Sequence, residues 1–157
     1  MPLQEMILLH DVWYLTDAES MQEALGALIS SVALPPGLDR EALLDALLAR
    51  EEMMSTAIGN GIAIPHVRRF GSESLQHDIV VVAYLFAPVD WKALDGIPVH
   101  TLFLVLAKDE ASHLQLLAEI AHVASDESFV EFLKTMPERD ALAEKIRALQ
   151  ESSTEKS

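Results

Sequence analysis

Two nearly continuous apolar runs, Ile79 to Phe86 and Val99 to Ala107, constrain the fold of this 157-residue chain most strongly. Both are rich in β-branched and aromatic residues, which favour strands. A strand that is apolar at almost every position is typical of a sheet covered on both faces. Asp95-Gly96 is a turn signal between the two runs. We therefore expect them to be central strands of a buried sheet.

Helical patterns lie on both sides of these runs. Thr16 and Glu19 have capping-box spacing and predict a helix that Pro35-Pro36-Gly37 ends. Asp39 is a candidate N-cap for a second helix that runs to about Glu52. We expect a strand over Ile7 to Leu15 and, at best, partial order in residues 1–9.

The last third of the chain has a helical pattern throughout. Ser112 and Gln115 have capping-box spacing, so we expect a helix that begins at His113. A short helix containing Phe129 and a third helix from about Glu138 follow. Helices before, between and after the strands predict an α/β fold, a three-layer α/β/α sandwich around a mixed β-sheet.

The chain has the length of one domain, which we place at residues 1–150, followed by a flexible polar tail at residues 151–157. It contains no cysteine, which excludes disulfides and thiolate metal sites. The apolar run from Ile79 to Pro88 is far shorter than the roughly 20 residues of a membrane span. No signal-peptide pattern precedes it, so we expect a cytoplasmic protein without direct membrane insertion.

The net charge of −14 argues against nucleic-acid binding, because it repels phosphate backbones. It favours a basic patch on a protein partner, although solubility alone explains such a charge equally well.

The segment from Ser55 to His66 is the first candidate functional site. Gly59-Asn60-Gly61 forms a turn at low cost because Gly and Asn tolerate positive φ. Ile62 to Ile64 reads as a short buried strand, and Pro65 stiffens the backbone before His66. An imidazole held in one orientation suits a nucleophile, although a structural histidine at a strand end remains the alternative.

Two further residues have weaker local support. His113, as the first residue of its helix, would lie where free N–H groups favour an anion, or would simply face solvent. Arg50 carries a fork that matches phosphate oxygens, or interacts with the C-terminus of its own helix. The other histidines, His10, His77, His100 and His122, are interpreted as structural. The spacing of the histidines does not suggest a metal site.

The chain resembles the enzyme IIA proteins of the bacterial phosphoenolpyruvate-dependent phosphotransferase system, fructose/mannitol class, including the nitrogen-regulatory branch. The resemblance covers roughly residues 7–148. It is carried by three motifs, which are Arg50-Glu51 followed by Ser55 to His66, then Asp95-Gly96-Ile97-Pro98-Val99, then His113-Leu114-Gln115-Leu116-Leu117-Ala118.

This resemblance implies that His66 accepts the phosphoryl group, that His113 supports it and that Arg50 neutralises the phosphate. It implies no cofactor and no metal. The implied partners are an HPr-type phosphocarrier and either a IIB component or a regulatory protein target. Where the family usually has Gly-Lys after the active histidine, this chain has Val67-Arg68-Arg69, which puts the loop and the partner surface in doubt.

Two functions share this chemistry. A regulatory phosphocarrier is favoured because the chain is acidic and has no fused IIB or IIC segment. A stand-alone sugar-transport component that passes phosphate to a IIB domain is the alternative. A degenerate, non-phosphorylated interaction domain is disfavoured because all three site residues are present.

Overall fold

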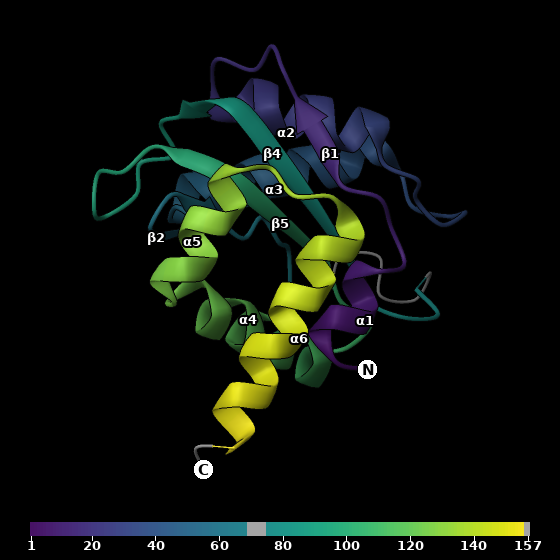
Figure 1. The fold of residues 1–157 in the computed structure, drawn as a ribbon. Coiled ribbons are helices and arrows are strands. Elements are labelled where there is room, and N and C mark those ends of the chain that lie inside the picture. Colours follow the sequence, from purple (N-terminus) through teal and green to yellow (C-terminus); the bar gives the residue numbers. More distant parts are fainter. Residues whose placement is uncertain (69–74, 156–157) are drawn as a thin grey trace.

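The computed structural model describes residues 1–68 and 75–155, with side chains as far as residue 152. The chain forms a sheet between two layers of helices (Figure 1). In chain order the elements are α1 (Leu3–Ile7), β1 (Trp13–Leu15), α2 (Met21–Ser31), α3 (Arg40–Met53), β2 (Ala57–Gly59), β3 (Ile62–Ala63), β4 (Ile79–Val89), β5 (Val99–Leu106), α4 (Glu110–Ala124), α5 (Glu127–Lys134) and α6 (Arg139–Glu155).

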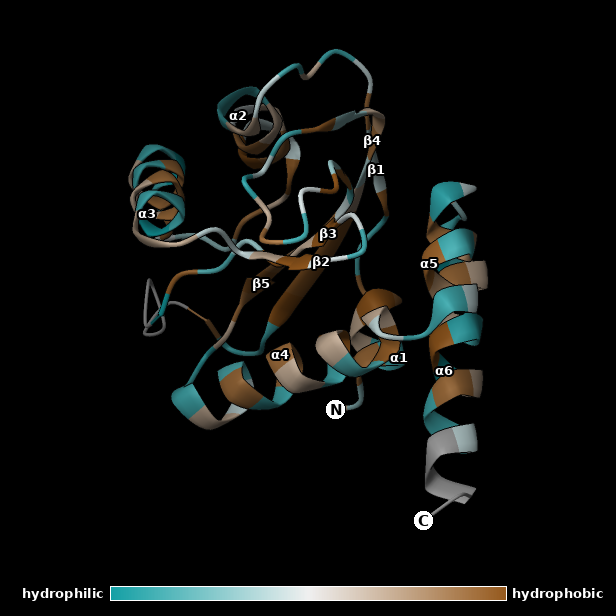
Figure 2. Ribbon diagram, turned by 90° about the vertical axis from the view of Figure 1, so that its left-hand side faces the viewer, coloured by the Kyte–Doolittle hydropathy of each residue, from teal (hydrophilic) through white to brown (hydrophobic). Residues whose placement is uncertain are grey.

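The sheet has five strands in the order β1-β4-β5-β3-β2. The two long central strands, β4 and β5, are antiparallel, whereas β1 is parallel to β4 and β3 is parallel to β5. Figure 2 shows α2 and α3 on one face of the sheet and α1, α4, α5 and α6 on the other. The predicted three-layer sandwich around a mixed sheet is thereby confirmed, as are the two apolar runs as its central strands.

The two faces of the sheet support two separate hydrophobic clusters. Side chains point alternately to opposite faces of a strand, so β4 contributes to both clusters. Val80, Val82 and Tyr84 belong to the cluster with α4 and α6, and Val81, Ala83 and Leu85 to the cluster with α2 and α3. Each large apolar side chain buried in this way stabilises the fold by about 1.5–3 kcal/mol.

The N-terminus differs from the prediction. Residues 3–7 form helix α1, and the strand expected over Ile7 to Leu15 shrinks to Trp13–Leu15. Leu3, Met6 and Ile7 are buried together in the cluster with α6. Their spacing of three and four residues is typical of a helix. A helix of five residues is too short for this spacing to be distinctive in the sequence.

The first capping prediction was wrong by one turn. Helix α2 begins after Ser20, whose Oγ accepts a hydrogen bond from the Glu23 backbone N–H at 3.1 Å. The Glu23 carboxylate in turn accepts from the Glu19 N–H at 3.1 Å. Ser20 and Glu23 have capping-box spacing, but the Glu23 carboxylate binds the N–H one residue before the N-cap; this pair takes the place of the predicted box of Thr16 and Glu19. The prediction of Asp39 as the N-cap of α3 is confirmed.

At the C-terminus, α6 continues beyond the predicted domain boundary at residue 150 and runs to Glu155. Within residues 1–68 and 75–155, no helix combines the length and the apolar character that a membrane crossing needs.

Candidate active site

A turn of three consecutive residues with positive φ connects β2 to β3. The φ angles of Gly59, Asn60 and Gly61 are 98°, 59° and 79°. Two glycines and an asparagine adopt this backbone with little strain, as the sequence predicted. The strand that follows is Ile62–Ala63, and the chain rejoins β5 further on through a bridge between His66 and Val105.

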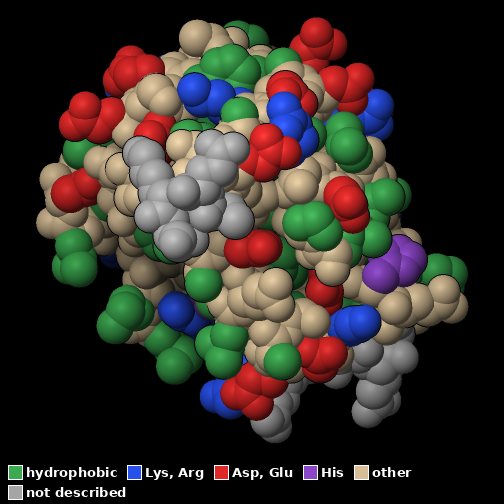
Figure 3. Space-filling view, turned by 60° about the horizontal axis from the view of Figure 1, so that its bottom comes forward, with side chains coloured by type: hydrophobic (Ala, Val, Ile, Leu, Met, Phe, Trp, Pro, Cys, Tyr) green, Lys and Arg blue, Asp and Glu red, His purple; other side chains and the backbone are tan. Residues whose placement is uncertain are grey.

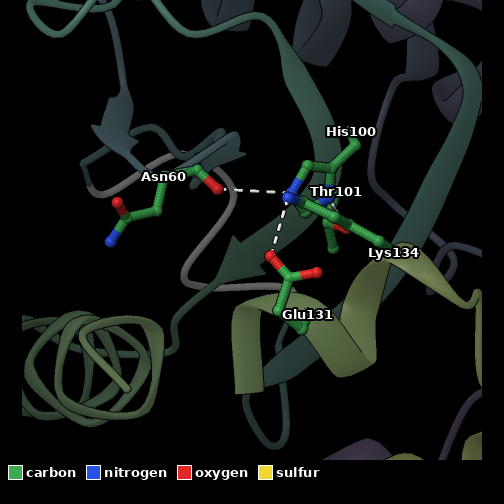
Figure 4. A network of polar contacts seen from close by, with 5 residues as sticks. All are labelled: Asn60, His100, Thr101, Glu131 and Lys134. Carbon is green, nitrogen blue, oxygen red and sulfur yellow. Dashed lines mark hydrogen bonds and ion pairs between the residues drawn. The ribbon is translucent and has the colours of Figure 1, made fainter. Parts of the chain in front are cut away.

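The turn is held by Asp95, which precedes β5, and by His100 of β5, whose contact with Asn60 is drawn in Figure 4. Asp95 accepts a hydrogen bond from the Asn60 N–H at 2.8 Å. The His100 Nε2 lies 3.2 Å from the Asn60 carbonyl oxygen, and its Nδ1 lies 2.8 Å from the Thr101 hydroxyl. A Cβ at Gly61 would lie 2.4 Å from His100 Cδ2, so this position requires glycine. Both ring nitrogens of His100 are therefore engaged in a structural contact.

The His66 ring is oriented by a hydrogen bond to the backbone two residues before it. Its Nδ1 donates to the Ile64 carbonyl at 2.6 Å, which fixes the proton on Nδ1 in the neutral ring. The Val105 N–H donates to the Pro65 carbonyl at 3.0 Å and anchors this segment to β5. Among the described residues, Nε2 has no hydrogen-bond partner, so it keeps an unused lone pair.

His113 and Arg50 lie beside this ring. The His113 ring meets the His66 ring edge to face, with centroids 5.0 Å apart and planes at 87°. Arg50, in the last turn of α3, donates from Nη1 to the Met54 carbonyl at 2.6 Å. The structure thus brings together the three residues that the sequence singled out, from α3, from the segment after β3 and from α4.

These side chains line one pocket of about 290 Å³. Its lining combines two cationic side chains, two imidazoles, one carboxylate and an apolar wall. The lining residues are Arg50, His66, Arg68, Glu110, His113, Leu114 and Leu117.

The expected reason for the placement of His113 was wrong. Helix α4 begins at Glu110 behind an Asp109 N-cap, and Asp109 accepts from the Ser112 N–H at 2.8 Å. Ser112 is therefore inside the helix. The His113 N–H donates to the Asp109 carbonyl at 3.1 Å and is not free to bind an anion. His113 contributes its buried ring to the site.

Burial and positive charge favour the neutral form of both imidazoles. Desolvation lowers the pKa of His66, the Ile64 hydrogen bond opposes this, and the Arg50 charge lowers the pKa further. The pKa of His113 is lowered by burial first, then by the neighbouring His66 and Arg68, while Glu110 opposes the shift. These effects favour a neutral His66 imidazole, with its proton on Nδ1, beside a fixed positive charge.

Two residues of the pocket, Arg68 and Glu110, had no assigned role in the sequence reasoning. Arg68 was noted only as part of the departure Val67-Arg68-Arg69, and Arg69 lies outside the described residues. Arg68 forms an ion pair with Glu110. Glu110 lies one turn before His113 on α4, so an i, i+3 pairing pattern was the available signal.

A second pocket, of about 510 Å³, is larger but suits an anion less well. It contains His10 and His77, and its other lining residues are apolar or uncharged, without lysine or arginine. The pocket around His66 offers two guanidinium groups. Phosphate recognition requires such donors, so we take the smaller pocket as the candidate active site. Within residues 1–68 and 75–155, no group of three or more His, Asp or Glu side chains is arranged to hold a metal ion.

Comparison with known proteins gives a family match and several relatives. Residues 6–148 match the family model for the phosphoenolpyruvate-dependent sugar phosphotransferase system, EIIA 2. A nitrogen regulatory protein of Pseudomonas aeruginosa is 42% identical over 109 residues, which cover 68% of this chain and 69% of that protein. One from Bradyrhizobium diazoefficiens is 32% identical over 145 residues, which cover 91% and 92% of the two chains.

The crystal structure of the nitrogen regulatory protein IIA-Ntr from Neisseria meningitidis has a similar fold. It superimposes with a TM-score of 0.71 at 28% identity and covers 87% of this chain and 90% of its own.

Proposed function

The chain belongs to the EIIA 2 family of the phosphoenolpyruvate-dependent sugar phosphotransferase system, and we propose that His66 is its phosphoryl-accepting residue. It is a phosphotransferase component, which passes a phosphoryl group through a histidine. The observation that carries the assignment to His66 is the hydrogen bond from Nδ1 to the Ile64 carbonyl. It leaves the Nε2 lone pair available beside Arg50.

In the proposed step, the Nε2 lone pair of His66 attacks the phosphorus of a phosphohistidine on an HPr-type carrier. A new N–P bond forms at Nε2, the donor's N–P bond breaks, and that electron pair returns to the donor ring nitrogen. The donor ring enters with its second nitrogen protonated and leaves as neutral imidazole. His66 keeps its Nδ1 proton and becomes a phosphorylated imidazolium, which the Ile64 carbonyl stabilises. No proton is released.

Arg50 and His113 would stabilise the charge of the transferred group. Phosphoryl transfer depends mostly on positioning and on electrostatic stabilisation of the three equatorial oxygens. Arg50 supplies a permanent charge and a planar fork of donors. The His113 ring, 5.0 Å from the His66 ring, fixes the position of the attacking imidazole and offers a ring nitrogen to one oxygen.

The rim of the pocket offers an apolar surface for a carrier protein. Leu114 lines the pocket and is 64% exposed, and Met54, whose carbonyl Arg50 contacts, is 71% exposed. Exposed apolar side chains around a reactive group are typical of a docking surface. On the face drawn in Figure 3, acidic side chains are dispersed, with Lys and Arg beside several of them. The net charge of −14 would steer a basic carrier toward the protein.

We assign the output of the phosphorylated protein to nitrogen or metabolic regulation. The support is the pair of relatives named nitrogen regulatory protein, at 42% and 32% identity. The alternative is a stand-alone sugar-transport component that delivers phosphate to a IIB domain, which the family description favours. A cytoplasmic location stays a prediction.

Reconstituted phosphorylation tests the assignment of His66. The protein is incubated with radiolabelled phosphoenolpyruvate, enzyme I and an HPr-type carrier. We expect acid-labile label in the wild type and in the His122→Ala control, which removes an exposed histidine of α4. We expect none in a folded His66→Ala variant. Undiminished label in that variant would refute the proposal.

The two outputs differ in the fate of the phosphate. Phosphorylated and unphosphorylated protein are each immobilised and offered to candidate regulatory proteins, and the phosphorylated form is mixed with IIB domains. State-dependent binding without transfer to any IIB domain supports regulation. Rapid transfer to a IIB domain supports the transport alternative.

A further inference from the structure

The ion pair of Arg68 and Glu110 lies in the lining of the candidate active site. Arg68 follows His66 by two residues, and Glu110 is the first residue of α4. Both side chains are partly exposed, at 66% and 43%. The pair therefore joins the segment that carries one imidazole to the helix that carries the other.

Both side chains line the pocket beside the His113 ring. Burial and His66 lower the pKa of His113, Arg68 lowers it further, and Glu110 opposes the shift. A phosphoryl group on His66 adds about two negative charges to the same space. It would attract Arg68 and repel Glu110.

We propose that Glu110 competes with the phosphoryl group for Arg68, so that phosphorylation of His66 draws Arg68 from the carboxylate to the phosphoryl oxygens. This inference rests on the proposed role of His66. Glu110 then controls how strongly the pocket holds the phosphoryl group, while Arg50 remains available in both states.

Exchange of the Arg68 partner is physically inexpensive. An exposed ion pair contributes little to stability, so it opens easily. A phosphoryl group offers three strong acceptor oxygens with geometry that suits the guanidinium fork. The Glu110 side chain is 43% exposed, so solvent screens its charge whether or not Arg68 is bound to it.

Such competition suits a carrier. Interactions that hold the phosphorylated ground state as strongly as the transition state do not accelerate transfer. If Arg68 bound the phosphoryl group without competition, His66 would accept phosphate readily and release it slowly. Glu110 weakens that hold and keeps the group transferable in both directions.

The test is the equilibrium between the HPr-type carrier and this protein, with Glu110→Gln compared with the wild type. We expect the ratio of phosphorylated to unphosphorylated protein to rise about threefold to tenfold, and back-transfer to slow by a similar factor. The increase should shrink as salt is added, because the charges are partly exposed. Glu127→Gln is the matched control, since Glu127 is also the first residue of a helix with an aspartate N-cap. It should leave the ratio unchanged.

An Arg68→Gln variant distinguishes competition from simple repulsion. We expect Arg68→Gln alone to lower the phosphorylated fraction, and Glu110→Gln added to it to change that fraction less than about twofold. An unchanged ratio in Glu110→Gln, or an equal increase in the presence and absence of Arg68, would overturn the inference. Label in His66→Ala would instead refute the proposed function, so the two failures are distinguishable.

Discussion

His66 and His100 both lie along β5, with His100 near its start and His66 bridged to Val105 near its end, yet their surroundings differ in one decisive respect. Burial lowers the pKa of both rings, and each has a hydrogen bond to a backbone carbonyl. His100 also contacts the Thr101 hydroxyl with its second nitrogen at 2.8 Å. Among the described residues, the second nitrogen of His66 has no such partner and lies in a pocket with Arg50.

The comparison shows that a lowered pKa alone does not identify a reactive histidine. Reactivity requires an unused lone pair, a fixed ring orientation and a positive charge where the phosphoryl oxygens will lie. The His100 network satisfies every polar atom of its ring and serves the turn that positions β3. We therefore expect changes around His66 to alter transfer, and changes around His100 to alter stability.

Apart from the loss of His66 itself, Arg50→Ala should have the largest effect on transfer. Removing one group that stabilises transition-state charge slows related reactions by about 10²–10³-fold. Stability should fall by only about 1 kcal/mol, because a single partly exposed hydrogen bond to Met54 is lost. Single-turnover transfer from the phosphorylated carrier and urea unfolding measure the two effects. A large loss of stability with nearly normal transfer would make Arg50 a structural residue.

Gly61→Ala should lower stability rather than slow transfer. The added Cβ meets His100 and the φ of 79° strains any other residue, so we expect a loss of about 2–3 kcal/mol in unfolding free energy. Gly96→Ala is the control, because Gly96 has a φ of 74° but nothing within 4 Å of an added Cβ. Gly96→Ala should lose less unfolding free energy than Gly61→Ala. Equal losses in the two variants would show that the His100 contact contributes nothing.

His113→Ala should slow transfer less than Arg50→Ala, by about tenfold to a hundredfold, because an imidazole is a weaker partner for phosphate than a guanidinium. His113→Gln, which keeps a side-chain donor, should recover part of the rate. Stopped-flow transfer kinetics measure both variants. Wild-type rates in His113→Ala would restrict the site to His66 and Arg50.

The pH dependence is the smallest expected effect. His66 must be neutral to attack, so the rate of acceptance should fall a few-fold as the pH drops through a pKa below the ordinary value of about 6.5. Arg50→Ala should raise that pKa, because it removes a charge that disfavours protonation. Histidine NMR titrations follow the His66 ring directly. A midpoint above that of a model histidine would contradict the described environment.

Much of the fold followed from periodicity. The strand β4 is apolar throughout, and β5 is apolar except at His100 and Thr101. Helix α3 has both its cap and its apolar face in the sequence. The failures concern competition between similar local signals. Ser20 displaced Thr16 and Asp109 displaced Ser112 as N-caps, because tertiary packing chooses among adjacent residues with equal capping ability. Helix α1 depends on burial against α6, which five residues do not reveal.

The three proposed site residues were found by motif, and the structure places them in one pocket. The sequence did not predict how the charged side chains of the pocket pair with one another. The contact between Arg68 and Glu110 spans 42 positions of the chain, so no local pattern indicates it. Likewise, no sequence pattern indicates that the Ile64 carbonyl accepts the proton on His66 Nδ1.

The most direct test of the account is to locate the phosphoryl group on the imidazole itself. Protein labelled with ¹⁵N in its histidines is phosphorylated through the HPr-type carrier and studied by NMR correlation of the ring nitrogens and phosphorus. We predict one N–P bond, at Nε2 of His66, with the rings of His100 and His113 unmodified. Phosphate at Nδ1 of His66, or on any other histidine, would contradict it.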